Sequence, residues 1–184
     1  MIGLSWAGER GVLEADRTFD LDRFERLYER SWPDVFRYAW LIARNHHDAE
    51  DIAAEAFRRA LESWAAGRGP QGEPMPWLLV ITRRIAIDRA RRRRLIAWLP
   101  MDEARDREDE RGAQAIRSSE VWMWFERLCE VVPASQREAL FLRFVFDLAD
   151  ADGAAVMRTS VGNYRTLVSR GLAALRRQPE AAER

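Results

Sequence analysis

The 184 residues suffice for one ordinary domain or two small ones, and a composition of 47% apolar and 33% charged residues argues against a disordered chain. Thirty basic residues, all arginine, balance thirty acidic ones. No apolar run approaches the roughly 20 residues of a membrane-spanning helix, and the start lacks a signal-peptide pattern, so we expect a cytoplasmic protein without membrane insertion.

Apolar residues recur with helical spacing along the chain, and no alternation of period two is long enough to indicate a sheet. The sequence therefore predicts an all-α protein. Residues 20–45 favour two helices, because Asp20 is a good N-cap and Pro33 suits the first turn of a second helix that ends near Asn45.

A third helix is expected to begin at Asp48, whose side chain can cap the first amides, and to end at about Trp64. Its buried residues would be Ala53, Phe57, Ala60 and Trp64. A charged stripe is left on the outside, made of Asp51, Glu55, Arg58 and Glu62. Such a stripe is either plain solvated surface or a docking face for a partner protein.

The fourth helix, from about Pro76, presents an apolar face of Leu78, Ile81 and Ile85 and then a block rich in arginine. Residues 82–94, "TRRIAIDRARRRR", hold seven arginines and one aspartate. Two or three arginines would suit the end of a helix dipole, but seven form a field of like charge that a polyanion would offset. The block therefore favours phosphate binding.

The stretch "MDEARDREDERGAQ" has no large apolar residue after Met101 and reads as a flexible acidic linker. Helical spacing returns in "VWMWFERLCEVV" and "ASQREALFLRFVF", so we expect two small helical domains. The predicted divisions are an N-terminal extension of unknown role (1–18), a first domain (19–97), the linker (98–119), a second domain (120–178) and a tail (179–184).

The last helix has a continuous apolar stripe and a polar opposite side. Ser160 can cap it, and "ADADGAAVM" can supply the supporting helix of a helix-turn-helix. The stripe consists of Val161, Tyr164, Val168, Leu172 and Leu175, and the other side carries Asn163, Thr166 and Arg170 with Arg165 at the border. Asparagine and arginine pair with base edges in a major groove, which suggests DNA reading.

Two stretches carry a family resemblance. "FERLYERSWPDVFRYAWLIARNHHDAEDIAAEAFRRAL", followed by "PWLLVITRRIAIDRARRRR", resembles region 2 of the extracytoplasmic-function (ECF) group of bacterial sigma factors. "VPASQREALFLRFVFDLADADGAAVMRTSVGNYRTLVSRGLAALRR" resembles their region 4. The resemblance implies a non-catalytic protein without cofactor, metal or small-molecule substrate, which binds core RNA polymerase and promoter DNA.

The resemblance also implies roles for residues at matching positions. Contacts to core polymerase fall on Asp51, Glu55, Arg58 and Glu62. Contacts to the minus-ten element fall on Trp77, Arg83, Arg84, Asp88 and Arg91. Readers of the minus-thirty-five element are Asn163, Arg165, Thr166 and Arg170. An anti-sigma factor is a further partner that the sequence leaves open.

Several positions depart from the family pattern. Arg84 stands where an asparagine is common, Gly153 replaces a core aliphatic residue, Arg158 replaces the turn glycine and Leu167 replaces an arginine. A glycine inside a helix costs about 1 kcal/mol relative to alanine, so we expect a looser region 4 and expect Gly153→Ile to stabilise it.

Three alternatives remain open at this point. "HHDAED" crowds histidine and carboxylate residues as in some metal-dependent phosphohydrolases, although helix capping explains it more simply. A stand-alone helix-turn-helix regulator would bind duplex DNA without polymerase. A degenerate sigma paralogue would bind polymerase and no longer read the minus-thirty-five element.

Overall fold

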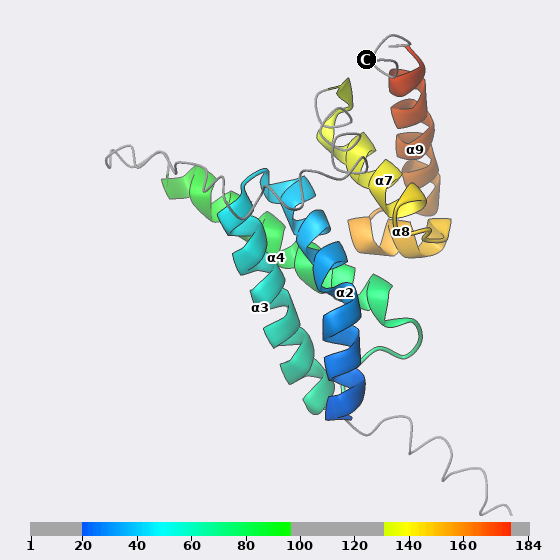
Figure 1. The fold of residues 1–184 in the computed structure, drawn as a ribbon. Helices are drawn as coiled ribbons and strands as arrows, with labels where there is room; N and C mark the ends of the chain where they lie inside the picture. Colours follow the sequence, from blue (N-terminus) through cyan, green and yellow to red (C-terminus); the bar gives the residue numbers. More distant parts are fainter. Residues whose placement is uncertain (1–19, 97–130, 178–184) are drawn as a thin grey trace, which may run out of the picture.

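The computed structural model describes residues 20–96 and 131–177, and within these ranges it has six helices and no strand. This confirms the predicted all-α class. One group comprises α2 (Leu21–Ala43), α3 (His46–Ala65) and α4 (Pro74–Ile96). The other comprises α7 (Ala134–Phe144), α8 (Asp150–Met157) and α9 (Val161–Arg176), as Figure 1 shows. The predicted extension, acidic linker and tail fall outside the described residues, and the domain limits stay predictions.

Helix α2 is continuous although it contains Pro33, so the prediction of two helices over this stretch was wrong. Asp20 caps it as predicted, with its side chain accepting a hydrogen bond from the Arg23 amide at 3.2 Å. Proline removes one backbone hydrogen bond, but residues on both sides of it, from Phe24 to Leu41, are buried on the same core. That shared burial keeps the two halves in line.

Helix α3 is capped by Asn45, whose side chain accepts a hydrogen bond from the Asp48 amide at 2.9 Å. The assignment of the cap to Asp48 was therefore wrong, because Asp48 lies inside the first turn and its side chain is buried toward α4. The predicted buried face is confirmed at Ala53, Phe57, Ala60 and Trp64.

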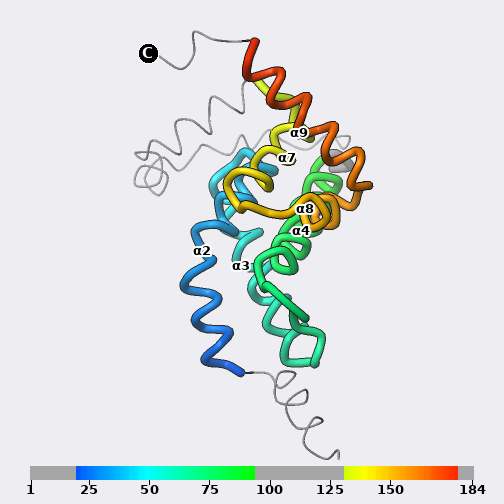
Figure 2. Tube along the Cα trace, turned by 90° about the vertical axis from the view of Figure 1, so that its right-hand side faces the viewer, coloured from blue at the N-terminus to red at the C-terminus, as the bar shows by residue number. Residues whose placement is uncertain are grey.

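Helix α4 is packed on two sides. It lies against α2 and α3, and α8 of the second group packs on it as well, which Figure 2 shows from the side. Leu78 and Ile85 are buried as predicted, whereas Ile81 is only partly buried. Leu79 and Thr82 are fully buried as well, so α4 is covered over more of its surface than a single apolar face indicates.

Helices α8 and α9 form the predicted helix-turn-helix, and the hydroxyl of Ser160 accepts a hydrogen bond from the Asn163 amide at 3.1 Å. Tyr164 is fully buried, but Val161 is 37% exposed, so the stripe was wrong at that residue. The first turn of a helix after a tight turn has neighbours on fewer sides, and burial along α9 begins at Tyr164.

Candidate nucleic-acid and partner interfaces

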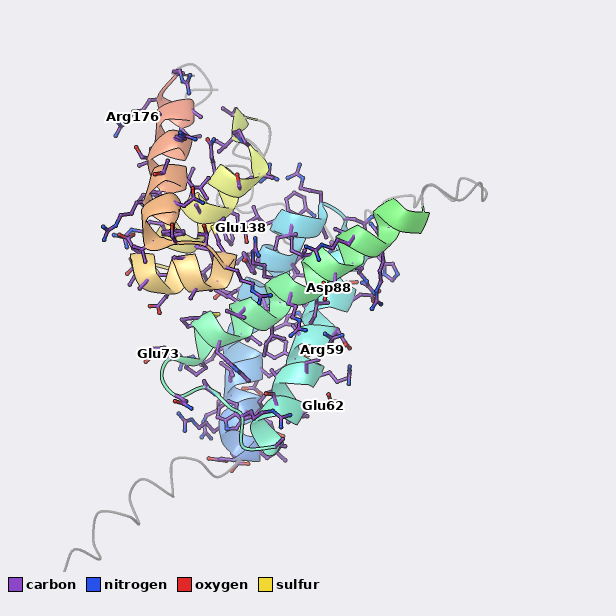
Figure 3. All side chains as sticks on the ribbon, turned by 180° about the vertical axis from the view of Figure 1, so that it is seen from behind. Arg59, Glu62, Glu73, Asp88, Glu138 and Arg176 are labelled. Carbon is purple, nitrogen blue, oxygen red and sulfur yellow. The ribbon has the colours of Figure 1, made fainter. Side chains whose placement is uncertain are left out.

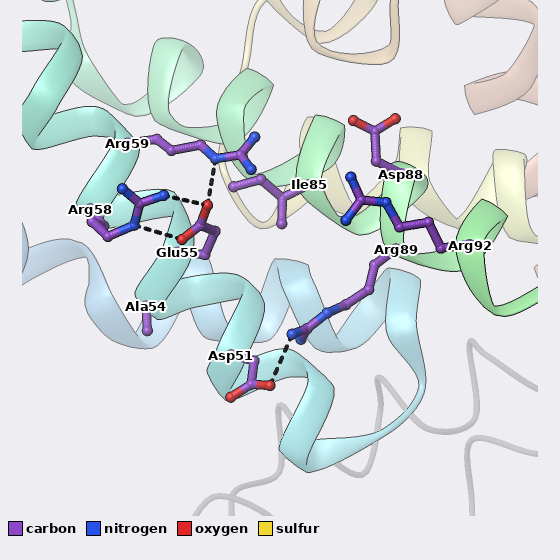
Figure 4. A pocket seen from close by; sticks show the side chains of 9 residues that line it. All are labelled: Asp51, Ala54, Glu55, Arg58, Arg59, Ile85, Asp88, Arg89 and Arg92. Carbon is purple, nitrogen blue, oxygen red and sulfur yellow. Dashed lines mark hydrogen bonds and ion pairs between the residues drawn. The ribbon is translucent and has the colours of Figure 1, made fainter.

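A groove of about 500 Å³ runs between α3 and α4, lined mainly by charged side chains (Figure 4). Arg58 donates to Glu55 at 2.7 Å and also pairs with Glu62 one turn further on. Asp51 accepts a hydrogen bond across the groove from Arg89 of α4 at 3.0 Å. The four stripe residues therefore lie on one accessible side of α3, with three of them, Asp51, Glu55 and Arg58, in the groove wall.

Arginines keep Glu55 ionised. Hydrogen bonds from Arg58 and then Arg59, against an opposing effect of desolvation, lower the pKa of Glu55 to about 2. The hydrogen bond and charge of Glu55 in turn raise the pKa of Arg58. Glu55 and Arg58 thus keep opposite charges over the whole physiological pH range.

The arginine block is only partly free. Arg93 and Arg89 reach back to the buried carboxylate of Asp48, Arg89 at 3.7 Å. Arg83 turns to the opposite side and meets Glu138 of α7. The prediction that the entire block forms an uncompensated field was therefore wrong, because the tertiary fold brings carboxylates to three of its members. Among the described side chains of α4, the exposed arginines outside these pairs are Arg84, Arg91 and Arg92.

The predicted minus-ten residues do not all share one face. Trp77, Arg84, Asp88 and Arg91 are spaced by seven, four and three residues, which places them along one side of α4. Trp77 is partly buried, with its ring edge on Trp64 at 6.1 Å between centroids. Arg83 lies about 100° round the helix from Arg84 and is half-buried against the second group.

Helix α9 exposes all four predicted minus-thirty-five residues. Asn163, Thr166 and Arg170 share the side opposite Tyr164. Arg165 lies at the border, as expected, and its guanidinium donates to Asp150 of α8 at 2.6 Å. Among the four readers, Arg165 alone forms an ion pair with α8.

Comparisons with known proteins identify the two helical groups. Residues 27–96 match Sigma-70 region 2, and residues 122–175 match Sigma-70, region 4. The ECF RNA polymerase sigma factor SigX of Bacillus subtilis (strain 168) is 27% identical over 169 residues, covering 86% of this chain and 84% of SigX. The chain belongs to the ECF group of the sigma-70 family.

Further relatives agree with this membership. The ECF sigma factor SigE of Mycolicibacterium smegmatis is 29% identical over 172 residues, which cover 90% of this chain and 66% of SigE. The fold is shared with the sigma factor RpoE of Bartonella quintana, solved in complex with the anti-sigma factor NepR, at a TM-score of 0.67 and 19% identity. That match covers 88% of this chain and 99% of RpoE.

As an ECF sigma factor, the protein binds core RNA polymerase and directs it to promoters for transcription initiation. Sigma factors are regulatory, non-catalytic proteins. Among the described residues no helix is long and apolar enough to cross a membrane.

The "HHDAED" stretch of this sigma factor has a structural explanation. His46 stacks obliquely on Phe36 with ring centroids 5.0 Å apart, Asn45 provides the cap and Asp48 binds arginines of α4. In the two described ranges, no three His, Cys, Asp or Glu side chains gather where they could hold a metal ion. The enzyme alternative therefore gains no support from this stretch.

In region 4, the small residue Gly153 of α8 lies against the large side chain of Tyr164 of α9. A Cβ at this position would overlap the ring of Tyr164, which is fully buried and donates its hydroxyl to the Ala139 carbonyl at 3.2 Å. Burial raises the pKa of Tyr164 to about 12, so the hydroxyl remains a donor. A larger side chain at Gly153 therefore has no free space, contrary to the expectation for Gly153→Ile, because the tyrosine fills the volume that an aliphatic side chain would occupy.

Arg158 occupies the left-handed conformation at the end of α8, with φ of 54°. This backbone geometry favours glycine, which explains why a glycine is usual there. The turn forms in this sigma factor nevertheless, since the Arg158 amide still bonds to carbonyls of α8.

Sequence reasoning missed the carboxylates that bind the arginines. Glu138 lies between Arg137 and Ala139 of α7, and its partners Arg83 and Tyr38 are 55 and 100 residues away along the chain. Asp48 was read as a cap, and Asp150 was assigned no partner. The one signal that could have indicated Glu138 is a carboxylate on a helical face that is otherwise apolar.

Proposed function

We propose that this sigma factor docks on core polymerase through the stripe of Asp51, Glu55, Arg58 and Glu62. The observation that carries this assignment is the groove in Figure 4, where ion pairs hold charged groups in fixed positions on an accessible face. Fixed charges favour recognition of one complementary surface, because little side-chain freedom is lost on binding.

Glu62→Arg tests this docking with little risk to the fold, since the Glu62 side chain is 61% exposed and its ion-pair partner Arg58 is exposed as well. We expect affinity for core polymerase to fall about tenfold, because like charges would then face each other across the interface. Glu29→Arg is the matched control, an equal charge change on exposed α2. Equal binding by both variants would contradict the docking face.

For the minus-ten element, the proposal assigns the side of α4 with Trp77, Arg84, Asp88 and Arg91 as the accessible readers. Arg83 joins them once it is released from Glu138. Arg84→Asn, which restores the usual family residue, should change base preference at one promoter position, while Arg91→Gln should weaken binding evenly across sequences. Transcription from a promoter library with both variants separates base reading from phosphate binding.

For the minus-thirty-five element, the proposed readers are Asn163, Arg165, Thr166 and Arg170 of α9. A well-placed bidentate side chain is worth about 1–3 kcal/mol of base discrimination, so Asn163→Ala and Arg170→Ala should relax preference without abolishing binding. Transcription from promoters varied only in this element is the measurement. If transcription by the parent protein does not depend on the sequence of this element, and neither substitution changes that, the result would favour the degenerate paralogue.

The remaining assignments follow from this role. A stand-alone regulator would bind duplex DNA and slow its migration in a gel without polymerase. We expect such a shift in mobility only when core enzyme is present. We also propose a cytoplasmic location, an absence of enzyme activity and an anti-sigma partner, as RpoE of Bartonella quintana has in its complex. Co-purification from the native cell tests the partner.

A further inference from the structure

Glu138 of α7 lies at the junction of the two helical groups (Figure 3) and is only 8% exposed. Its Oε1 accepts hydrogen bonds from the Tyr38 hydroxyl of α2 and from Nε of Arg83 of α4, both at 2.7 Å. Arg83 makes a second, longer bond to Oε2 at 3.4 Å. One carboxylate of region 4 is thus held by two helices of region 2.

Aromatic side chains pack around the Tyr38 end of this triad. Tyr38 is fully buried, and Phe146 packs edge-on against it at 6.0 Å and against Phe141 at 5.2 Å. Burial and the charge of Glu138 raise the pKa of Tyr38, so it stays a donor. Burial tends to lower the pKa of Arg83, but the bond and charge of Glu138 raise it overall. A buried ion pair that loses one partner leaves an uncompensated charge, so the contact is sensitive to single changes.

In the docked arrangement, the two DNA-binding helices lie too close together to reach both promoter elements. Helix α4 packs on α8 and α8 packs on α9, and packed helix axes are about 8–10 Å apart, so α4 and α9 lie within about 20 Å of each other. The minus-ten and minus-thirty-five elements are about 25 base pairs apart, which is about 85 Å of B-form DNA. Both elements can be read together only after region 4 has left region 2.

We propose that Tyr38, Arg83 and Glu138 form a latch that holds region 4 on region 2 in the free protein and that opens when polymerase and promoter separate the regions. While the latch is closed, the guanidinium of Arg83 donates its hydrogen bonds to the carboxylate of Glu138. Carboxylates and phosphates use the same donor geometry of arginine, so a promoter phosphate competes with Glu138 for one site. This last step rests on the proposed role of Arg83 at the minus-ten element; the latch itself does not.

The test measures the distance between the two regions in the full chain by single-molecule energy transfer. Dyes are attached at Glu25→Cys on α2 and Ser169→Cys on α9, both exposed, in a Cys129→Ser background. Glu138→Gln keeps the shape and removes the charge, and Tyr38→Phe removes one hydrogen bond. We expect a low-transfer, open population that grows in the order parent, Tyr38→Phe, Glu138→Gln. Glu29→Gln, a matched carboxylate on the outer side of α2, should behave as the parent.

Opening should also make assembly easier. If about a tenth of the free molecules are open, complete opening raises apparent affinity for core polymerase and promoter by at most about tenfold. Glu138→Gln should approach that gain, while Glu29→Gln should not. Circular dichroism confirms that each variant remains helical.

Two results would overturn the latch: unchanged energy transfer in Glu138→Gln, or an open Glu138→Gln whose apparent affinity equals that of the parent. Failure of the proposed function looks different. A parent that does not bind core polymerase contradicts the docking face, while the energy-transfer result in the free protein still decides the latch.

Discussion

The two helices that carry the predicted DNA readers are held in different ways. Helix α4 is covered by α2 and α3 on one side and by α8 on another, and three of its arginines meet carboxylates of other helices. Helix α9 packs on α7 and α8 along one side only, and its readers face solvent apart from the Arg165 contact to Asp150. The DNA-binding charge of α4 is therefore conditional on competing contacts with several carboxylates, whereas among the predicted readers of α9 Arg165 alone pairs with one.

Equal truncations in the two helices should have unequal costs. Leu78→Ala in α4 removes a fully buried side chain and should cost about 2–5 kcal/mol of unfolding free energy, because a cavity remains. Leu172→Ala in α9 removes a partly buried one and should cost about 1 kcal/mol. Urea denaturation followed by circular dichroism measures both, and similar costs would break the comparison.

The packing of α9 on α8 depends on the exchange between Gly153 and Tyr164. Gly153→Ile should destabilise the protein by about 1–3 kcal/mol, contrary to the expectation from the family pattern, because the new side chain overlaps the tyrosine ring. Thermal unfolding of the full chain is the measurement.

A second substitution provides the control for this pair. Tyr164→Val combined with Gly153→Ile moves the larger side chain from α9 to α8 and should recover most of the stability that the single Gly153→Ile variant lacks. Additive destabilisation in the double variant would show that the two side chains do not share one space.

The arginines of α4 should differ in their response to salt. Arg91→Gln with Arg92→Gln removes exposed charges and should reduce the salt slope of promoter-complex affinity by about 0.7–0.9 for each phosphate that is no longer neutralised. Arg93→Gln should change the slope less, because its guanidinium already pairs with Asp48. Titration at several salt concentrations tests this, and equal slopes for all three positions would mean that Asp48 does not hold Arg93 in the complex.

The smallest effect is expected at the turn between α8 and α9. Arg158→Gly should stabilise the protein by about 0.5–1 kcal/mol, since glycine adopts the left-handed backbone of this position without strain. Arg158→Ala, which keeps a Cβ, should bring no such gain. A rise in thermal midpoint for glycine alone is the confirming result.

Local features of the sequence predicted much of the fold. The helical class and the caps at Asp20 and Ser160 depend on contacts within a few residues, the buried face of α3 follows from its helical periodicity, and all are present. Pro33 and Asp48 were misread because a proline and a capping carboxylate are local signals that tertiary packing overrode. The candidate polymerase and DNA residues came from the family resemblance, and their roles stay predictions.

By itself the sequence determined the periodicity of each helix, the concentration of arginine in α4 and membership of the sigma-70 family, since these follow from residue order. Only the tertiary structure decided which arginines are free. Glu138 reaches Arg83 and Tyr38 across 55 and 100 residues, and Tyr164 fills the space above Gly153 from the next helix. Such pairings depend on how whole helices pack, and helical periodicity records only which side of a helix is apolar, not which charged group will lie opposite it.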